Sequence, residues 1–157
     1  MRIAILRNLK EELGDNFLGG LHPASFDAQM VPVLIVAKNL VRREKYLELM
    51  HSCNNAIGSA GLHESIGWKT GEYVAAGKAI VNERFCYEVP GDFCEGKNYL
   101  PFSSVEECVG NVKYLLEHPE ETVRMQLRNR EYYETYLAPD KLTERTLHSV
   151  EGKPAQV

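Results

Sequence analysis

Two carboxylates, Glu64 and Glu72, are separated by seven residues around a glycine turn that opens a helix. A short apolar segment, residues 55–60, precedes this turn, and a second one, residues 78–82, follows the helix. A strand, a loop, the N-terminus of a helix and another strand form the unit with which α/β proteins hold phosphorylated ligands at the carboxyl ends of their strands. The pattern therefore indicates a ligand of the nucleotide type.

The start of this helix has the chemistry to hold a diphosphate. Ile66, Gly67 and Trp68 lie where the backbone N–H groups of a new helix have no partner within the helix. These donors act together with the positive end of the helix dipole. Gly67 would let the backbone approach the phosphates without a Cβ in the way. Lys69 fits two interpretations equally, a phosphate ligand or a solvated lysine.

The two carboxylates suit the hydroxyl groups of the same ligand. Glu72 lies about a turn and a half into the helix, where it could accept two hydrogen bonds from a vicinal diol such as a ribose. Glu64, in the loop beyond the strand, could reach hydroxyls of a sugar attached to the diphosphate, with His63 beside it as a candidate general base. The alternatives are a solvated helix residue for Glu72, a loop charge or helix cap for Glu64, and an ordinary polar loop residue for His63.

The elements that must position these residues alternate between helix and strand. Helices are expected over residues 2–13 with a glycine C-cap at Gly14, over 42–53, from a capping box at Ser103 or Ser104 to His118, over 120–137, and over 140–150. Strands are expected over 17–21, 31–37, 55–60, 78–82 and 98–102. This alternation predicts an α/β fold, with a Rossmann-like, doubly wound and mainly parallel sheet flanked by helices. Because the chain starts on a helix, we expect an N-terminal strand to be missing.

Composition and length limit the class of protein. The 157 residues suit one domain, residues 1–150, followed by a polar tail at 151–157. With 44% hydrophobic and 25% charged residues the chain is expected to fold, and its net charge of -4 argues against nucleic-acid binding through bulk positive charge. No apolar run is long enough to span a membrane. The four cysteines form no C-x-x-C pair and the histidines are scattered, so we expect a cytoplasmic protein with reduced thiols and no metal site.

The segment from Gly61 to Val81 resembles the donor-binding segment of glycosyltransferases with the two-domain GT-B architecture. In that family a Glu-x7-Glu pattern precedes an alanine-rich helix and a Gly-x-Ala/Pro-Ile/Val-Val strand. Glu64 matches the first glutamate, Gly67 the loop glycine and Glu72 the second glutamate. The resemblance implies that the first glutamate contacts the donor sugar, the loop amides hold the diphosphate and the second glutamate binds the ribose. It covers roughly residues 41–150.

The chain also departs from this family pattern. Family members usually carry an Arg and a Lys early in this domain that clamp the diphosphate, and this chain has no clean match, only the candidates Lys38, Arg42, Arg43 and Lys69. We expect the acceptor-binding N-terminal domain of GT-B enzymes to be missing from this chain, and the resemblance therefore implies the C-terminal, donor-binding half.

The resemblance implies nucleotide-sugar-dependent hexosyl transfer with retention at the anomeric carbon, without a metal ion or other cofactor. The expected ligand is a nucleotide-diphosphate sugar, and the expected partner is a separate acceptor-binding domain or a second copy of the chain. One alternative is a non-catalytic nucleotide-binding or scaffold module that pairs with another chain. Another is an unrelated doubly wound domain whose motif arose by chance, which would have no nucleotide affinity.

Overall fold

The computed structural model describes residues 1–150, so the polar tail predicted at 151–157 lies outside the described residues. The described helices and strands follow in chain order: α1 (Arg2–Leu13), α2 (Phe26–Met30), α3 (Arg43–Ser52), β1 (Asn55–Gly58), α4 (Trp68–Ala75), β2 (Ala79–Glu83), β3 (Tyr99–Phe102), α5 (Val105–Glu117), α6 (Pro119–Tyr132) and α7 (Pro139–Val150). Short 3-10 turns and one π-helical turn, Tyr133–Leu137, connect some of them.

A parallel three-stranded sheet forms the centre of the fold, in the order β1-β2-β3. Asn55 pairs with Ala79 across β1 and β2, and Ile80 pairs with Tyr99 across β2 and β3. Helix α4 makes the crossover from β1 to β2, whereas a loop, residues 84–98, connects β2 to β3. The predicted α/β, Rossmann-like fold with a parallel sheet flanked by helices is confirmed.

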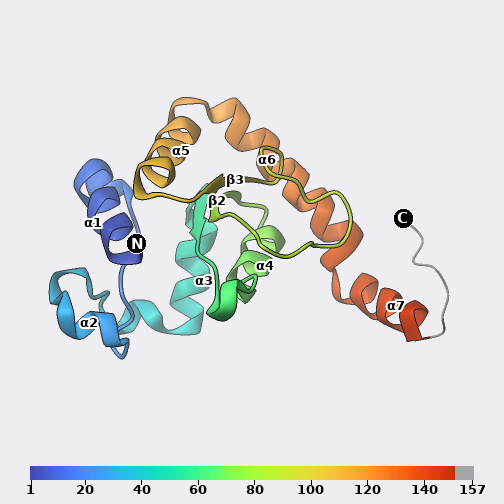
Figure 1. Ribbon diagram of the computed structural model, residues 1–157, viewed down its shortest axis with the longest axis horizontal. Coiled ribbons are helices and arrows are strands. Elements are labelled where there is room, and N and C mark those ends of the chain that lie inside the picture. The colour runs from blue at the N-terminus through green and yellow to red at the C-terminus, as the bar shows by residue number, and fades with distance from the viewer. Residues whose placement is uncertain (151–157) are drawn as a thin grey trace.

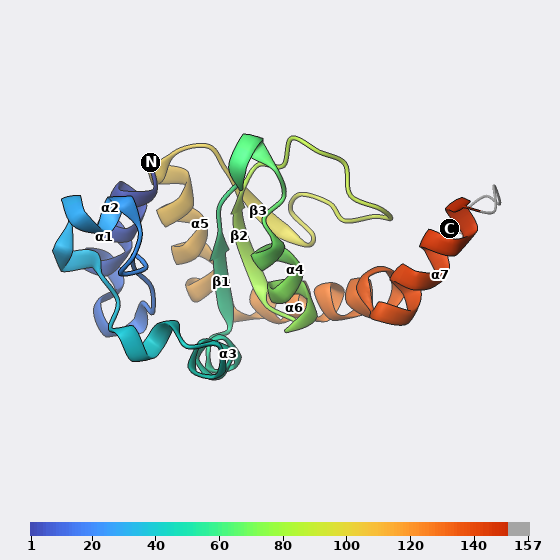
Figure 2. The same ribbon diagram turned by 90° about the horizontal axis from the view of Figure 1, so that it is seen from below.

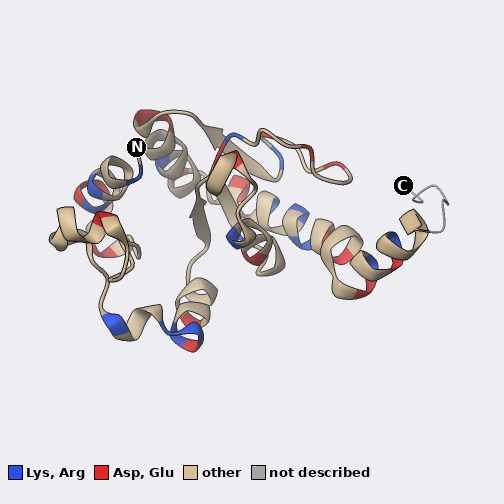
Figure 3. Cartoon of the chain, turned by 60° about the horizontal axis from the view of Figure 1, so that its bottom comes forward, with Lys and Arg blue, Asp and Glu red and all other residues tan. Residues whose placement is uncertain are grey.

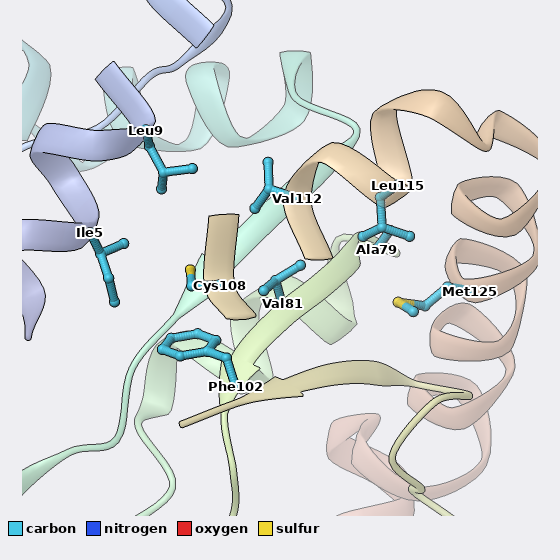
Figure 4. Packing of buried hydrophobic residues seen from close by; sticks show 9 residues of the cluster. All are labelled: Ile5, Leu9, Ala79, Val81, Phe102, Cys108, Val112, Leu115 and Met125. Atoms are coloured by element: carbon cyan, nitrogen blue, oxygen red, sulfur yellow. The ribbon is translucent and has the colours of Figure 1, made fainter. Parts of the chain in front are cut away.

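Helices cover both faces of this sheet (Figure 1). Helices α1 and α5 lie on one side of the strands, and α4 lies on the other (Figure 2). The central strand β2 is buried along most of its length, as expected for a parallel strand with helices on both faces. Figure 4 shows the larger apolar cluster, to which α1, β2, β3, α5 and α6 contribute Ile5, Leu9, Ala79, Val81, Phe102, Cys108, Val112, Leu115 and Met125.

The strands predicted at 17–21 and 31–37 are wrong. These segments meet at a single bridge between Leu21 and Ile35, and residues Pro32–Leu34 form a 3-10 turn. Pro32 has no N–H to donate to a ladder and its φ suits the first position of a helical turn, so the apolar run 31–37 cannot extend as a strand. Helix α2 lies between the two segments, and its buried Ala28 packs with Leu21.

The predicted helix ends agree with the structure at two places and differ at a third. Gly14 ends α1 with a positive φ of 53°. At α5, the capping box forms in the Ser104 register, because the Glu107 N–H donates to Ser104 Oγ at 3.1 Å. The helix predicted over 120–137 changes type before its end. The α-helical part, α6, ends at Tyr132, and residues Tyr133–Leu137 follow it directly as the π-helical turn.

Figure 3 shows Lys and Arg interspersed with Asp and Glu along the helices in that view. Within residues 1–150, no helix has both the length and the apolar character that a membrane crossing requires.

Candidate functional site

The candidate site lies at the carboxyl ends of β1 and β2. Strand β1 ends at Gly58 and its neighbour β2 ends at Glu83, and because the strands are parallel both ends lie at the same edge of the sheet. The segment that follows β1 and the loop that follows β2 emerge at this edge (Figure 2). Ligands of open α/β sheets bind at such an edge.

The last residues of β2 hold the start of α4 against β1. The buried side chain of Asn82 lies over Gly58, where a Cβ would come within 1.8 Å of Asn82 Oδ1, so the position requires glycine. Asn82 Oδ1 also accepts a hydrogen bond from the hydroxyl of Thr70, in the first turn of α4, at 3.4 Å. This buried contact fixes the first turn of α4 relative to the sheet.

His63 and Glu64 lie in a strained turn between β1 and α4. They belong to the 3-10 turn Leu62–Glu64, and both have left-handed backbones, with φ of 56° and 59°. Such conformations cost non-glycine residues roughly 1 kcal/mol or more each. The turn is closed by the Gly61 N–H, which donates to the Ser65 carbonyl at 2.7 Å. The side chains of His63 and Glu64 are exposed at the sheet edge.

The loop after β2 contacts this turn. The hydroxyl of Tyr87 donates to the carbonyl of His63 at 3.3 Å. A hydrogen bond with the carboxylate of Glu64 raises the pKa of the exposed Cys86 thiol. The sequence motif therefore does not stand alone, because residues 84–98 border its strained turn.

Helix α4 starts where the sequence predicts. Gly67 is its N-cap residue and supplies no side-chain cap to the first N–H groups of the helix. The backbone of Gly67 has an ordinary φ of -63°, and a Cβ there would contact only the Ser59 carbonyl, at 3.4 Å. The fold itself thus does not demand glycine at this position. Ile66 is half-buried just before the helix, and Trp68 and Lys69 are exposed in its first turn.

Glu72 is neither a free diol acceptor nor a solvated helix residue in this structure. Its side chain is only 14% exposed, and its carboxylate forms an ion pair with Arg43 of α3. Its second oxygen accepts a hydrogen bond from the hydroxyl of Tyr46, also on α3, at 3.0 Å. Burial and this neighbouring carboxylate raise the pKa of Tyr46, so the phenol stays protonated and keeps donating.

Two cations flank the face of α4 that carries Glu72. The guanidinium of Arg43 lies 5.8 Å from the ring centroid of Trp68 and 5.9 Å from that of Tyr46. The ammonium of Lys69 also lies 5.9 Å from the Tyr46 ring. Folding therefore brings together two of the four basic candidates that the sequence left open. Of the others, Lys38 lies in a 3-10 turn and Arg42 is the residue before α3.

A family model described as glycosyl transferase-like matches residues 4–145 of the chain. The chain belongs to this family. No curated protein and no solved structure matches it. The resemblance to GT-B glycosyltransferases is confirmed at the level of the family, and glycosyl transfer is its general activity. The roles of individual residues remain predictions.

Two hollows in this glycosyl transferase-like domain border the candidate site. A hollow of about 360 Å³ lies within the loop after β2 and is lined by Phe85, Tyr87, Glu88, Val89, Gly91, Phe93, Glu95 and Tyr99. A smaller apolar hollow of about 120 Å³ lies beside α4, where Ile66, Thr70 and Gly71 line one side. Neither hollow is lined by Arg43, Lys69 or Glu72, so this charged cluster lies outside both hollows. Among residues 1–150, no three His, Cys, Asp or Glu side chains are grouped to hold a metal ion.

Sequence reasoning missed several residues at the sheet edge. Asn82 and Glu83 end β2, and the rule that ligand-binding groups follow parallel strands could have identified both. Tyr46 and its contact with Glu72 had no sequence signal, because the two residues are 26 positions apart on different helices.

Proposed function

We propose that this domain is the donor-binding half of a nucleotide-sugar-dependent glycosyltransferase. The diphosphate would lie at the start of α4 near Gly67, the ribose on Glu72 and the donor sugar near Glu64. The observation that carries the proposal is the cluster of Arg43, Lys69 and Glu72 beside the first turn of α4, in a chain that belongs to the glycosyl transferase-like family.

The diphosphate assignment rests on charge and on free donors. The backbone N–H groups of Ile66, Gly67 and Trp68 lie at the start of α4, where the helix dipole favours an anion. Arg43 and Lys69 add two positive side chains near the same turn. When the glycosyl bond breaks, the leaving diphosphate gains negative charge, and these groups would stabilise it without a metal ion.

The ribose assignment requires an exchange of partners at Glu72. In the structure its carboxylate is paired with Arg43, whose side chain is 57% exposed. The guanidinium faces solvent whereas the carboxylate is largely buried, so the two hydroxyl donors of a ribose diol would have to take the place of Arg43 on Glu72. The released guanidinium would then be free to pair with the diphosphate, which suits a bidentate donor.

The sugar assignment rests on the exposed turn that carries His63 and Glu64. Glu64 is proposed to accept hydrogen bonds from hydroxyls of the donor sugar. In the transfer itself, an acceptor hydroxyl oxygen bonds to the anomeric carbon on the same face from which the diphosphate leaves, and the bond to the diphosphate breaks. We propose that His63 acts as the general base and accepts the proton that this hydroxyl releases. Retention of the anomeric configuration is proposed from the two-glutamate pattern.

The first experiment is a titration of the chain with UDP, GDP and ADP. Thermal unfolding and the fluorescence of Trp68, the single tryptophan, are recorded for the wild type and for Glu72→Ala. A nucleotide at 100 times its dissociation constant should add about 2.7 kcal/mol to the free energy of unfolding. We expect one nucleotide to bind the wild type and the Glu72→Ala variant to lose this binding.

The control is Glu48→Ala, which removes an exposed glutamate of α3 that pairs with Lys45 and does not contact the cluster around Glu72. It should bind the nucleotide as the wild type does. Absence of a shift with all three nucleotides would count against a donor site in this chain.

A second candidate function, a module that pairs with another chain, is favoured by the exposed apolar side chains. On α7, Leu147 and Val150 are 56% and 82% exposed, and near α2, Phe26, Met30 and Val33 are each at least 70% exposed. These surfaces suit a separate acceptor-binding domain or a second copy of the chain. Transfer or hydrolysis of a nucleotide sugar by the chain alone would contradict a purely non-catalytic role.

A further inference from the structure

The carboxylate of Glu83, at the end of β2, is hydrogen-bonded to the backbone of the loop after β1. Glu83 Oε2 accepts a hydrogen bond from the Ala60 N–H at 2.5 Å. A charged acceptor makes this bond stronger than one between neutral groups. Ala60 immediately precedes Gly61, whose own N–H closes the strained turn on Ser65. Glu83 therefore acts at the base of the turn that carries His63 and Glu64.

The turn needs such support because its backbone is strained. Two consecutive non-glycine residues, His63 and Glu64, have positive φ. Strained conformations of this kind persist only where neighbouring contacts over-determine them. Tyr87 supports the turn at the His63 carbonyl, and Glu83 supports it from the side of the sheet.

Within the described part of the chain, the side chain of Glu83 is hydrogen-bonded to the backbone and not to a neighbouring cation. The next residue, Arg84, pairs with Glu95 of the same loop. Among residues 1–150, the ion pairs do not include Glu83. The preceding residue, Asn82, anchors the first turn of α4 through Thr70. The end of β2 thus holds both sides of the motif, the loop through Glu83 and the helix through Asn82.

We propose that Glu83 is a positioning residue, which holds the 61–65 turn through Ala60 and thereby sets the place of Glu64 at the donor sugar. This inference rests on the proposed function for the role of Glu64. Glu83 itself acts through the backbone and does not need to touch the donor.

The first test needs no ligand and compares Glu83→Ala with Glu83→Gln by amide hydrogen exchange of the whole chain. The alanine variant removes the acceptor of the Ala60 N–H, whereas glutamine keeps an amide oxygen at the same position. We expect exchange of residues 59–66 to be about ten times faster in Glu83→Ala, and close to the wild-type rate in Glu83→Gln. The control Glu106→Ala, an exposed glutamate on α5, should leave this segment unchanged.

Two outcomes of this test would overturn the inference. One is wild-type exchange of residues 59–66 in Glu83→Ala. The other is a loss of protection throughout the chain, which would make Glu83 a residue of general stability. Both outcomes are independent of nucleotide binding, so the hold of Glu83 on the turn is decided even if no donor site exists.

The second test measures the effect on the ligand. The nucleoside diphosphate that binds the wild type is compared with its glucose ester in the same variants. We expect Glu83→Ala to weaken the sugar ester about tenfold relative to the diphosphate, with rescue by Glu83→Gln. An equal loss for both ligands would contradict positioning of Glu64, and a wild type that binds neither would contradict the proposed function instead.

Discussion

At the scale of single residues, Glu72 is the group whose surroundings differ most from what its position suggests. Its carboxylate is held by Arg43 and Tyr46, both from α3. The guanidinium therefore competes with the ribose for the carboxylate of Glu72. Under the proposed function it is also a ligand for the diphosphate. These two roles have opposite effects on binding, so they can be separated by choosing the ligand.

The prediction concerns Arg43→Met, which keeps an unbranched side chain over Trp68 but removes the charge. We expect the nucleoside diphosphate to bind about tenfold more weakly, because one phosphate partner is lost. The corresponding nucleoside, which has no phosphate, should bind as tightly as before or more tightly, because Glu72 is then free. Isothermal titration calorimetry measures both affinities.

The matched control is Lys45→Met, which removes another exposed cation from α3 whose partner is Glu48. It should change neither affinity. Equal weakening of the nucleoside and the diphosphate by Arg43→Met would show that Arg43 supports the shape of the site and not the phosphate.

At the scale of elements, a buried amide pair joins α6 to the amino ends of β2 and β3. Asn129 Nδ2 donates to the carbonyls of Lys78 at 2.7 Å and Asn98 at 2.8 Å. Its Oδ1 accepts from Asn98 Nδ2 at 3.1 Å. The Lys78 ammonium in turn donates to the Cys53 carbonyl, at the end of α3, at 2.6 Å. One buried network therefore connects α3, α6 and two strands at the edge opposite the candidate site.

This network predicts a large loss of stability for Asn129→Ala. The substitution leaves two carbonyls and one amide unpaired in the interior, since Asn129 has no exposed surface. We expect the free energy of unfolding to fall by about 2–4 kcal/mol, measured by urea denaturation. The control Asn8→Ala, on the exposed face of α1, should change it by no more than about 0.5 kcal/mol.

The same elements show what the sequence could predict. Apolar runs between turn residues predict the three strands of the sheet and the helix start at Gly67. The predicted ends of each strand lie within about two residues of the observed ends. The segments 17–21 and 31–37 are as apolar as those strands, but they meet at only one parallel bridge, and Pro32 begins a 3-10 turn that interrupts the second segment. For the site, the residues of the motif were predicted, whereas the pair of Arg43 and Glu72 joins positions 29 apart and has no local pattern.

At the scale of the whole molecule, buried acidic protons make the fold sensitive to alkali. Burial raises the pKa of Cys108 to about 12 from a usual value of 9.0, and that of Tyr132 to about 12 from 10.0. A raised pKa in the folded state contributes stability that is complete below the unfolded value and is lost as the pH rises toward the folded value. Lys78 acts in the opposite direction, because burial lowers its pKa.

We therefore expect the free energy of unfolding to decrease above pH 9. Cys108 alone should account for about 1 kcal/mol of this decrease between pH 8 and pH 10. Urea denaturation at both pH values, on the wild type and on Cys108→Ala, measures the difference. The contribution of Lys78 cancels in this comparison, and an equal decrease in both proteins would contradict the assignment to Cys108.

The left-handed turn at His63 and Glu64 has a consequence for laboratory evolution. Glycine adopts positive φ at no steric cost, so a variant library screened only for heat resistance would favour glycine at both positions. Under the proposed function, the variants selected by such a screen would be more thermally stable but would no longer bind the donor sugar. A library designed to raise the thermal stability of this protein should therefore leave His63 and Glu64 unchanged.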